Sequence, residues 1–125
     1  MNLNQITIYS KKTIETVEFF EKLGLRRIVD SLPRYARLEC PDGESTLSVN
    51  TTDETGATGH IVLYFECADL DIRVTELTQL GLEFDQEPQD QPWLWREAYL
   101  RDPNGNKICL FHAGENRKNP PWRVK

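Results

Sequence analysis

Two stretches of the chain repeat one pattern of hydrophobic and polar positions. In residues 5–9 apolar and polar side chains alternate, which is the period of a half-buried strand. Apolar residues then recur at helical spacing from Ile14 to Leu23, and Gly24 is suited to end that helix. The pattern predicts three further strands, at 25–31, 35–40 and 45–50.

The second half of the chain follows the same plan. A strand is expected at 60–66, then a helix that starts at Asp69 or Asp71 and stops at Gly81. The remaining strands are expected at 82–85, 93–101 and 107–112, the last two joined by the turn Asp102-Pro103-Asn104-Gly105. Leu-Gly-Leu stands at the same helix-to-strand corner in both halves, at 23–25 and 80–82.

We therefore predict an α+β fold built from two βαβββ modules, which form a cup-shaped mixed sheet with the helices on its outer face. The alternative is that the two halves of the sequence resemble each other by chance within one α+β sheet. The expected organisation is a first module at 1–51, a linker at 52–58, a second module at 59–112 and a basic tail with proline and tryptophan at 113–125.

Composition narrows the class of protein. A net charge of −5 and a pI near 5.0 argue against nucleic acid as a partner, because phosphate contacts need a basic surface. No apolar run is long enough to span a membrane, and the N-terminus lacks the regions of a signal peptide, so we expect a cytoplasmic location.

The three scattered cysteines predict reduced thiols. The basic tail is expected to dock on its own or a neighbouring subunit, and a homodimer is expected.

Side-chain parity predicts a binding surface. Each helix covers one face of its sheet, so the intervening strand residues must point the other way. Many of these residues are aromatic and a few are charged, as in a pocket for a small organic molecule, with flat or cationic ligands favoured. The predicted ligand-binding residues are Tyr9, Tyr35, Arg37, Glu39, His60, Tyr64, Trp93, Trp95, Glu97, Tyr99 and Cys109. A polar loop at 87–91 is expected to act as a lid. The alternative is a mixed face partly buried by dimerisation.

These features together resemble the vicinal oxygen chelate superfamily, which includes glyoxalase I, extradiol dioxygenases, fosfomycin-resistance enzymes and metal-free bleomycin-resistance proteins. The resemblance rests on the paired modules, on Gly59-His60-Ile61 opening a strand and on Asp102-Pro103-Asn104-Gly105 entering the last strand, and it covers about residues 3–112. It implies the fold more specifically than the function, since one fold hosts several activities.

In metal-using members of that superfamily, the ligands come from the first and last strand of each module. By position the resemblance gives Gln5 and His60 as candidate metal ligands. The last-strand sites, glutamates in glyoxalase I, fall on Ser48 and Cys109, and an ungapped alignment of the turns gives Leu47 instead of Ser48. Neither choice supplies the carboxylate that a hard divalent ion prefers.

Two functions follow as hypotheses. The first is a small-molecule-binding protein without a complete catalytic metal site; the alternative is a metal-dependent lyase, isomerase or dioxygenase that uses Gln5 and His60 around a divalent metal. Glu39 and Glu97 are candidate acid/base residues, unless each pairs with Arg37 or Lys107. Cys109 is a candidate nucleophile or thiolate ligand, unless it only fills space.

Overall fold

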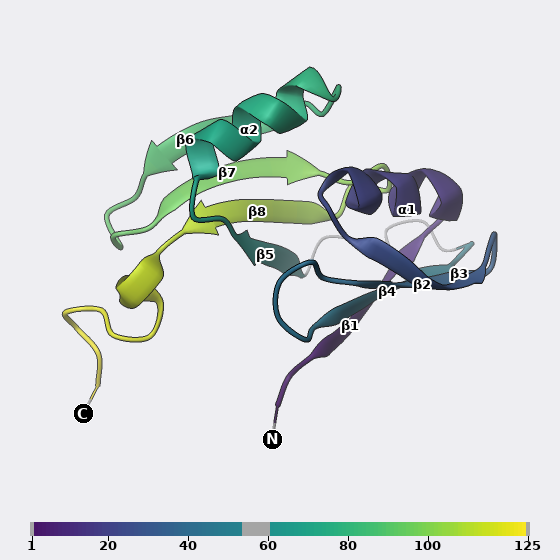
Figure 1. Cartoon of the computed structure of the whole chain (residues 1–125), viewed down its shortest axis with the longest axis horizontal. Coiled ribbons are helices and arrows are strands. Elements are labelled where there is room, and N and C mark those ends of the chain that lie inside the picture. The colour runs from purple at the N-terminus through teal and green to yellow at the C-terminus, as the bar shows by residue number, and fades with distance from the viewer. Residues whose placement is uncertain (1, 54–60, 125) are drawn as a thin grey trace. The chain divides into compact units, whose positions relative to one another are not determined.

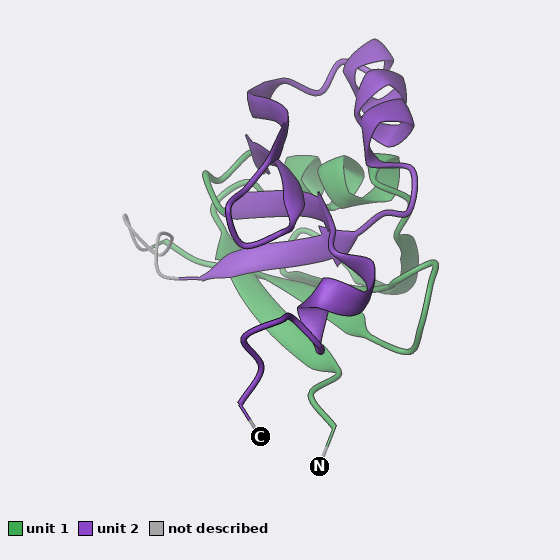
Figure 2. Ribbon diagram, turned by 90° about the vertical axis from the view of Figure 1, so that its left-hand side faces the viewer, with its two compact units in different colours: residues 1–60, 102–106 green, residues 61–101, 107–125 purple. Residues whose placement is uncertain are grey.

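The chain folds into two compact units, each of which is considered by itself. The computed structural model describes residues 2–53 and 61–124. Unit 1 comprises residues 1–60 together with 102–106, and unit 2 comprises residues 61–101 and 107–125 (Figure 2).

Unit 1 is a four-stranded mixed sheet with one helix on one face (Figure 1). Its elements are β1 (Gln5–Ser10), α1 (Thr13–Lys22), β2 (Arg26–Ser31), β3 (Tyr35–Glu39) and β4 (Thr46–Thr51). The strand order is β1-β4-β3-β2, with β1 parallel to β4 and the other pairs antiparallel. The helix buries Val17 and Phe20, and the sheet contributes Ile8, Leu38 and Val49 to the core. These are the apolar positions of the sequence pattern, so burial of one face drives the assembly of unit 1.

Unit 2 repeats this arrangement. Its elements are β5 (Val62–Glu66), α2 (Leu70–Gln79), β6 (Phe84–Asp90), β7 (Arg96–Arg101), β8 (Lys107–His112) and the 3-10 helix η1 (Gly114–Arg117). The order is β5-β8-β7-β6, with β5 parallel to β8. Leu77, Leu100 and Ile108 are fully buried between α2 and the sheet. None of the helices in the part of the chain that the structure describes has the length and apolar character needed to cross a membrane.

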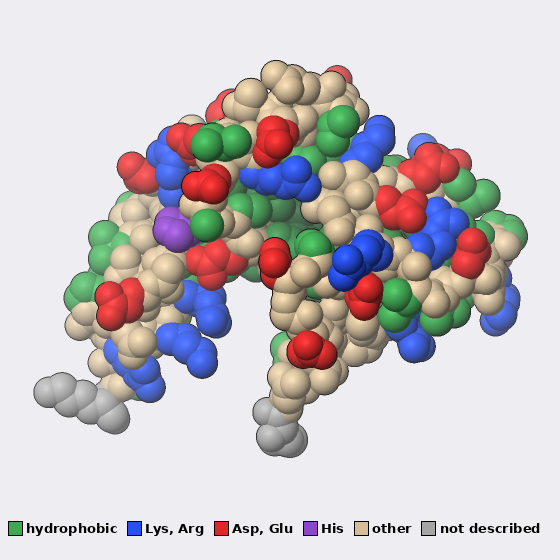
Figure 3. Space-filling model, viewed as in Figure 1, with side chains coloured by type: hydrophobic (Ala, Val, Ile, Leu, Met, Phe, Trp, Pro, Cys, Tyr) green, Lys and Arg blue, Asp and Glu red, His purple; other side chains and the backbone are tan. Residues whose placement is uncertain are grey.

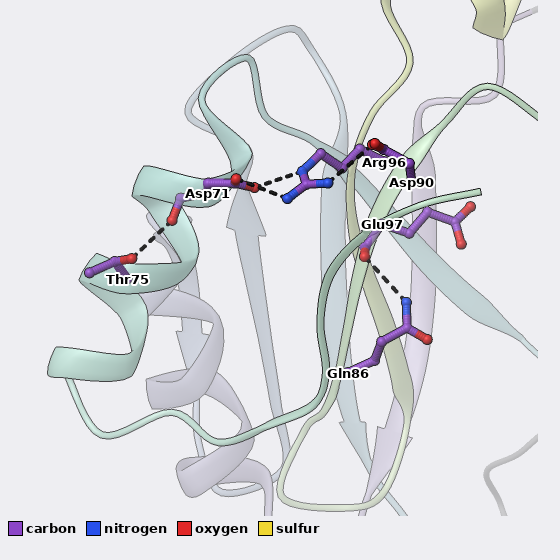
Figure 4. A network of polar contacts seen from close by, with 6 residues as sticks. All are labelled: Asp71, Thr75, Gln86, Asp90, Arg96 and Glu97. Atoms are coloured by element: carbon purple, nitrogen blue, oxygen red, sulfur yellow. Dashed lines mark hydrogen bonds and ion pairs between the residues drawn. The ribbon is translucent and has the colours of Figure 1, made fainter.

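A branched ion pair ties the start of α2 to the edge of the sheet (Figure 4). The Arg96 guanidinium donates to both oxygens of Asp71, at 2.8 and 3.0 Å, and to Asp90 at 3.1 Å. A bidentate pair fixes direction more firmly than a single contact. Arg96 therefore points toward the helix, and the next residue, Glu97, points to the opposite face.

The turn at 102–106 is closed by one buried carboxylate. Asp102 accepts hydrogen bonds from the backbone N–H groups of Asn104 and Asn106, at 2.9 and 2.8 Å, and from the Asn106 amide at 2.7 Å. The Asn104 amide in turn donates to the Tyr9 carbonyl and accepts from the Lys11 N–H, each at 3.1 Å. The Asp-Pro-Asn-Gly motif thus forms the expected turn and attaches it to the end of β1.

The α+β class and the βαβββ plan of both modules are confirmed, but two predictions in unit 2 were wrong. The expected lid at 87–91 is largely strand, because β6 continues to Asp90. As an edge strand it tolerates Pro88, whose missing N–H need not join a ladder. The expected strand at 93–101 begins only at Arg96, since Leu94 has a φ of 68° in a tight turn closed by Leu94 N–H to the Gln91 carbonyl.

The corner after α2 gives a first prediction. Gly81 has a φ of 95° and a Cβ there would meet nothing within 4 Å, so only backbone strain opposes a side chain. Gly81→Ala is expected to lower the free energy of unfolding by about 1 kcal/mol. Urea denaturation followed by circular dichroism measures it. Gly81→Asn, which tolerates this conformation better, should cost less, and an equal loss in both variants would contradict the explanation.

Candidate functional site

The uncovered face of the unit 2 sheet gathers most of the predicted site residues. In β7, Ala98 and Leu100 are buried toward α2, so Glu97 and Tyr99 lie on the other face. The strand register pairs Tyr99 with Cys109 of β8, and Tyr64 of β5 is also paired with Cys109. Parity therefore brings these side chains together, as the sequence predicts.

Glu97 is a buried carboxylate held by two aromatic donors. Its side chain is only 2% exposed. The Trp93 indole N–H donates to one oxygen and the Tyr99 hydroxyl to the other, each at 2.8 Å. Figure 4 shows the carboxylate directed away from α2, while the backbone carbonyl of Glu97 accepts from the Gln86 amide at 3.3 Å. Lys107, a suggested partner of Glu97, instead lies over the Tyr99 ring, 4.5 Å from its centroid.

An aromatic wall stands beside this carboxylate. Trp95 stacks on Phe111 with centroids 4.6 Å apart, and the Tyr64 ring meets both edge-on at 6.0 and 5.6 Å. Phe111 is buried, whereas Tyr64 remains 49% exposed and Trp93 45% exposed. Trp93 and Trp95 reach this face from the turn before β7 rather than from a strand. Phe111 therefore forms a buried apolar base, and the rings of Tyr64 and Trp93 keep edges that are open to solvent.

The start of the C-terminal tail is fastened to the same face. One oxygen of Glu66, at the end of β5, accepts from the N–H groups of Ala113 and Gly114, both at 2.8 Å. Arg117 lies 3.7 Å from the other oxygen, and the Asn116 carbonyl accepts from the Trp95 indole at 3.5 Å. Sequence reasoning missed Glu66, although it shares the parity of Tyr64 in the same strand. Figure 3 shows Lys and Arg side chains gathered around this tail.

Glu66 gives a second prediction. Burial alone would raise its pKa, but the hydrogen bonds from Ala113 and Gly114 and the nearby charges of Arg117 and His112 outweigh burial and leave the pKa below its ordinary value. A lowered carboxyl pKa contributes stability above the unfolded pKa of about 4.3, and this is lost as the pH falls through the folded pKa.

We therefore expect Glu66→Gln to lower the free energy of unfolding by about 1 kcal/mol at pH 7, and the difference from wild type to shrink as the pH falls below about 4. Urea denaturation across pH measures it. Glu115→Gln, with the same change in charge, serves as the control. A difference that stays constant down to pH 3 would contradict the role of the charged carboxylate.

Cys109 does not have the properties of a nucleophile. The residue is fully buried, and its Sγ lies 3.7 Å from the Leu110 carbonyl. Burial raises the pKa of this thiol to about 12. At neutral pH the free group is therefore a protonated thiol, which is a weak nucleophile.

A third prediction follows from this burial. Native protein treated with iodoacetamide at pH 8 should remain unmodified at Cys109, and the residue should react only after denaturation. Peptide mass spectrometry measures the labelling at each cysteine. Rapid alkylation of Cys109 in the folded protein would contradict this prediction and show that the thiol is reactive.

The predicted site residues of unit 1 have other partners. Glu39 pairs with Arg26 at 3.1 Å, and not with Arg37 as suggested. Arg37 donates from Nε to the Tyr35 hydroxyl at 3.0 Å. Tyr9 is exposed on β1. Glu39 and Glu97 belong to different units and each has its own partners, so the acid/base pair stays a prediction. His60 lies outside the described residues.

The described candidate metal positions do not fit a hard divalent ion. The Gln5 amide donates to the Ser48 hydroxyl at 3.0 Å and to the Ile6 carbonyl at 2.9 Å, and its oxygen accepts from the Thr46 hydroxyl. In unit 1, Gln5 stands two residues before Thr7, the register partner of Ser48. In unit 2 the same position, two residues before Tyr64, is held by Val62, whose side chain cannot bind a metal. Within residues 2–53 and 61–124, no three His, Cys, Asp or Glu side chains cluster so as to hold a metal ion.

Comparison with known proteins identifies the family. The sequence profile of the Glyoxalase/Bleomycin resistance protein/Dioxygenase superfamily matches residues 2–110. The chain therefore belongs to this superfamily, which confirms the resemblance of the sequence. A comparison with curated proteins found no match.

Solved structures share the fold at low sequence identity. A glyoxalase/bleomycin resistance protein/dioxygenase from Nocardioides is 20% identical, with a TM-score of 0.80 over 100% of this chain and 90% of its own. Lactoylglutathione lyase from Agrobacterium tumefaciens is 17% identical, with a TM-score of 0.74 over 89% of this chain and 92% of its own. TioX from Micromonospora sp. ML1 is 18% identical, with a TM-score of 0.72 over 90% of this chain and 99% of its own. Since this superfamily includes enzymes and resistance proteins, the choice between them rests on the site.

Proposed function

We propose that this chain is a small-molecule-binding protein that holds a flat, cationic organic ligand on the uncovered face of unit 2, without a resident catalytic metal. The observation that carries the proposal is the buried carboxylate of Glu97, fixed by Trp93 and Tyr99 beside the open edges of the aromatic wall. A carboxylate that accepts hydrogen bonds from the edges of two aromatic rings adds negative charge beside them, which strengthens their attraction for a cation.

The orientation of these groups is fixed before any ligand arrives. Glu97 holds the rings of Trp93 and Tyr99, and Phe111 and the Asn116 carbonyl hold the ring of Trp95. Rings that are already ordered lose little conformational freedom on binding, which favours affinity. Tyr64 and Trp93 still expose about half of their surface, so stacking area remains available to a ligand.

The competing function is a metal-dependent lyase, isomerase or dioxygenase of the same superfamily, with Gln5 and His60 around a divalent ion. It would require Gln5 to give up its bonds to Thr46 and Ser48. A cytoplasmic homodimer is part of the proposal, and sedimentation velocity tests its oligomeric state.

A fourth prediction tests the ligand class. In a Trp122→Phe background, which removes the tail fluorophore, N-methylquinolinium should quench tryptophan emission at lower concentration than the neutral isostere quinoline. The expected ratio of dissociation constants is about 3 to 30, from the range of cation–π energies. Glu97→Gln should abolish most of this ratio, and Trp95→Ala should weaken both ligands.

Glu18→Gln is the matched control, because it removes the same charge from an exposed position on α1 in the other unit. An unchanged ratio in Glu97→Gln would contradict the role of the carboxylate. Elemental analysis of protein purified without chelator separates the two functions. Metal well below one ion per chain is expected, whereas a full ion that is lost in His60→Ala would establish the metal-dependent alternative.

A further inference from the structure

The uncovered face of unit 1 has a chemistry of its own. The register of β1, β4 and β3 aligns Thr7 with Ser48 and Ser48 with Arg37 in one row across the strands. The neighbouring rows are also polar, and they consist of Tyr9, Asn50 and Tyr35 on one side and of Gln5, Thr46 and Glu39 on the other. No aliphatic residue stands among these nine positions.

Ser48 determines the direction of the bonds. Its side chain is 1% exposed, so its hydroxyl must find partners within the protein. The oxygen accepts from the Gln5 amide at 3.0 Å, and the Tyr35 hydroxyl lies 2.7 Å away. Either hydroxyl could donate in this pair, and we assign Ser48 as the donor, because the Gln5 amide can only donate to Ser48 and a buried hydroxyl proton needs an acceptor.

Tyr35 is then left as an outward donor. Its oxygen accepts from Ser48 and also from Arg37 Nε at 3.0 Å. A phenolic oxygen with both acceptor sites in use can only donate its own proton, and that proton has no acceptor among the described residues. The hydrogen bond from Ser48 and that from Arg37 together lower the pKa of Tyr35 despite partial burial, so its O–H is a stronger donor than an ordinary phenol.

Arg37 and Thr7 add two more donors. In the described structure the terminal nitrogens of Arg37 have no carboxylate partner, because the nearby Glu39 is paired with Arg26. The Thr7 oxygen lies 3.4 Å from the Gln5 amide nitrogen, whose two N–H groups make the shorter bonds to Ile6 and Ser48, so Thr7 keeps a hydroxyl proton that it can donate. Three groups in adjacent rows thus present donors and one of them is a fixed positive charge.

We propose that Tyr35, Arg37 and Thr7 form a subsite for the oxyanion group of a small molecule, a carboxylate or a phosphate, with Ser48 and Gln5 as positioning residues. A surface of donors with a guanidinium matches an acceptor-only anion in both charge and hydrogen bonding. The subsite lies within unit 1 and does not depend on the cation site proposed for unit 2.

The test uses three probes on the intact chain. Benzoate and inorganic phosphate supply the anion, and benzamide is a neutral isostere of benzoate. Nitrogen-15 NMR follows the Arg37 Nε–Hε signal, assigned by its absence in Arg37→Gln, together with the backbone signals of β1, β3 and β4. We expect benzoate and phosphate to shift these signals saturably, and benzamide to bind at least about fivefold more weakly than benzoate, as expected for the loss of a charge-assisted hydrogen bond.

Matched variants decide whether this subsite is responsible. Arg37→Gln and Tyr35→Phe should each weaken benzoate at least about fivefold, and Arg37→Lys should recover part of the loss. Arg34→Gln removes the same charge from the exposed turn between β2 and β3 and should leave the affinity unchanged.

Two results would overturn the proposal. One is equal binding of benzoate and benzamide, and the other is benzoate binding that is weakened as much by Arg34→Gln as by Arg37→Gln. Backbone spectra of each variant establish that the sheet is intact, and Arg37→Lys keeps the test valid if Tyr35→Phe disturbs the buried Ser48. The cation site is measured separately with N-methylquinolinium, so either proposal can fail alone.

Discussion

The parallel pairing of the first and last strand in each module is the constraint on which the rest of the structure depends. Neighbouring parallel strands cannot be joined by a tight turn, so the chain must cross over the sheet between them. In each unit the helix lies within this crossover and covers one sheet face. The opposite face is left without a helix, and its side chains are free to serve function rather than the main core.

The two units use that free face in opposite ways. Unit 1 lines it with hydroxyl, amide and guanidinium groups, whereas unit 2 packs a buried thiol and a buried carboxylate among aromatic rings. Ser48 and Cys109 hold equivalent register positions, and both are buried. A buried hydroxyl must be hydrogen-bonded, while a buried thiol behaves as a small hydrophobe. The residue at this position thus matches the polar network around it in unit 1 and the apolar cluster around it in unit 2.

The sequence was sufficient for the order of elements, since helical spacing up to Leu23 and Leu80 and the glycines after them left little freedom. It was insufficient where the local pattern did not determine the backbone. The polar segment at 87–91 reads as a loop, yet β6 continues to Asp90, because an edge strand needs neither apolar residues nor a full ladder. Trp93 and Trp95 were expected on a strand, and the positive φ of Leu94 instead brings them to the face from a turn. The burial of Cys109 depends on aromatic neighbours whose contacts no periodicity reveals.

The same hydrogen-bond logic applies to the candidate metal position at Gln5. A metal site needs lone pairs that converge on one point, but the Gln5 oxygen already accepts from Thr46 and the Ser48 oxygen already accepts from the Gln5 amide. Freeing each bond would cost about 1 kcal/mol, and neutral oxygens repay less of this than a carboxylate would. The bonds that satisfy these oxygens also turn the remaining protons of Tyr35 and Thr7 outward. In our proposal this strand pair therefore presents donors to a ligand, which is the chemistry that an anion requires.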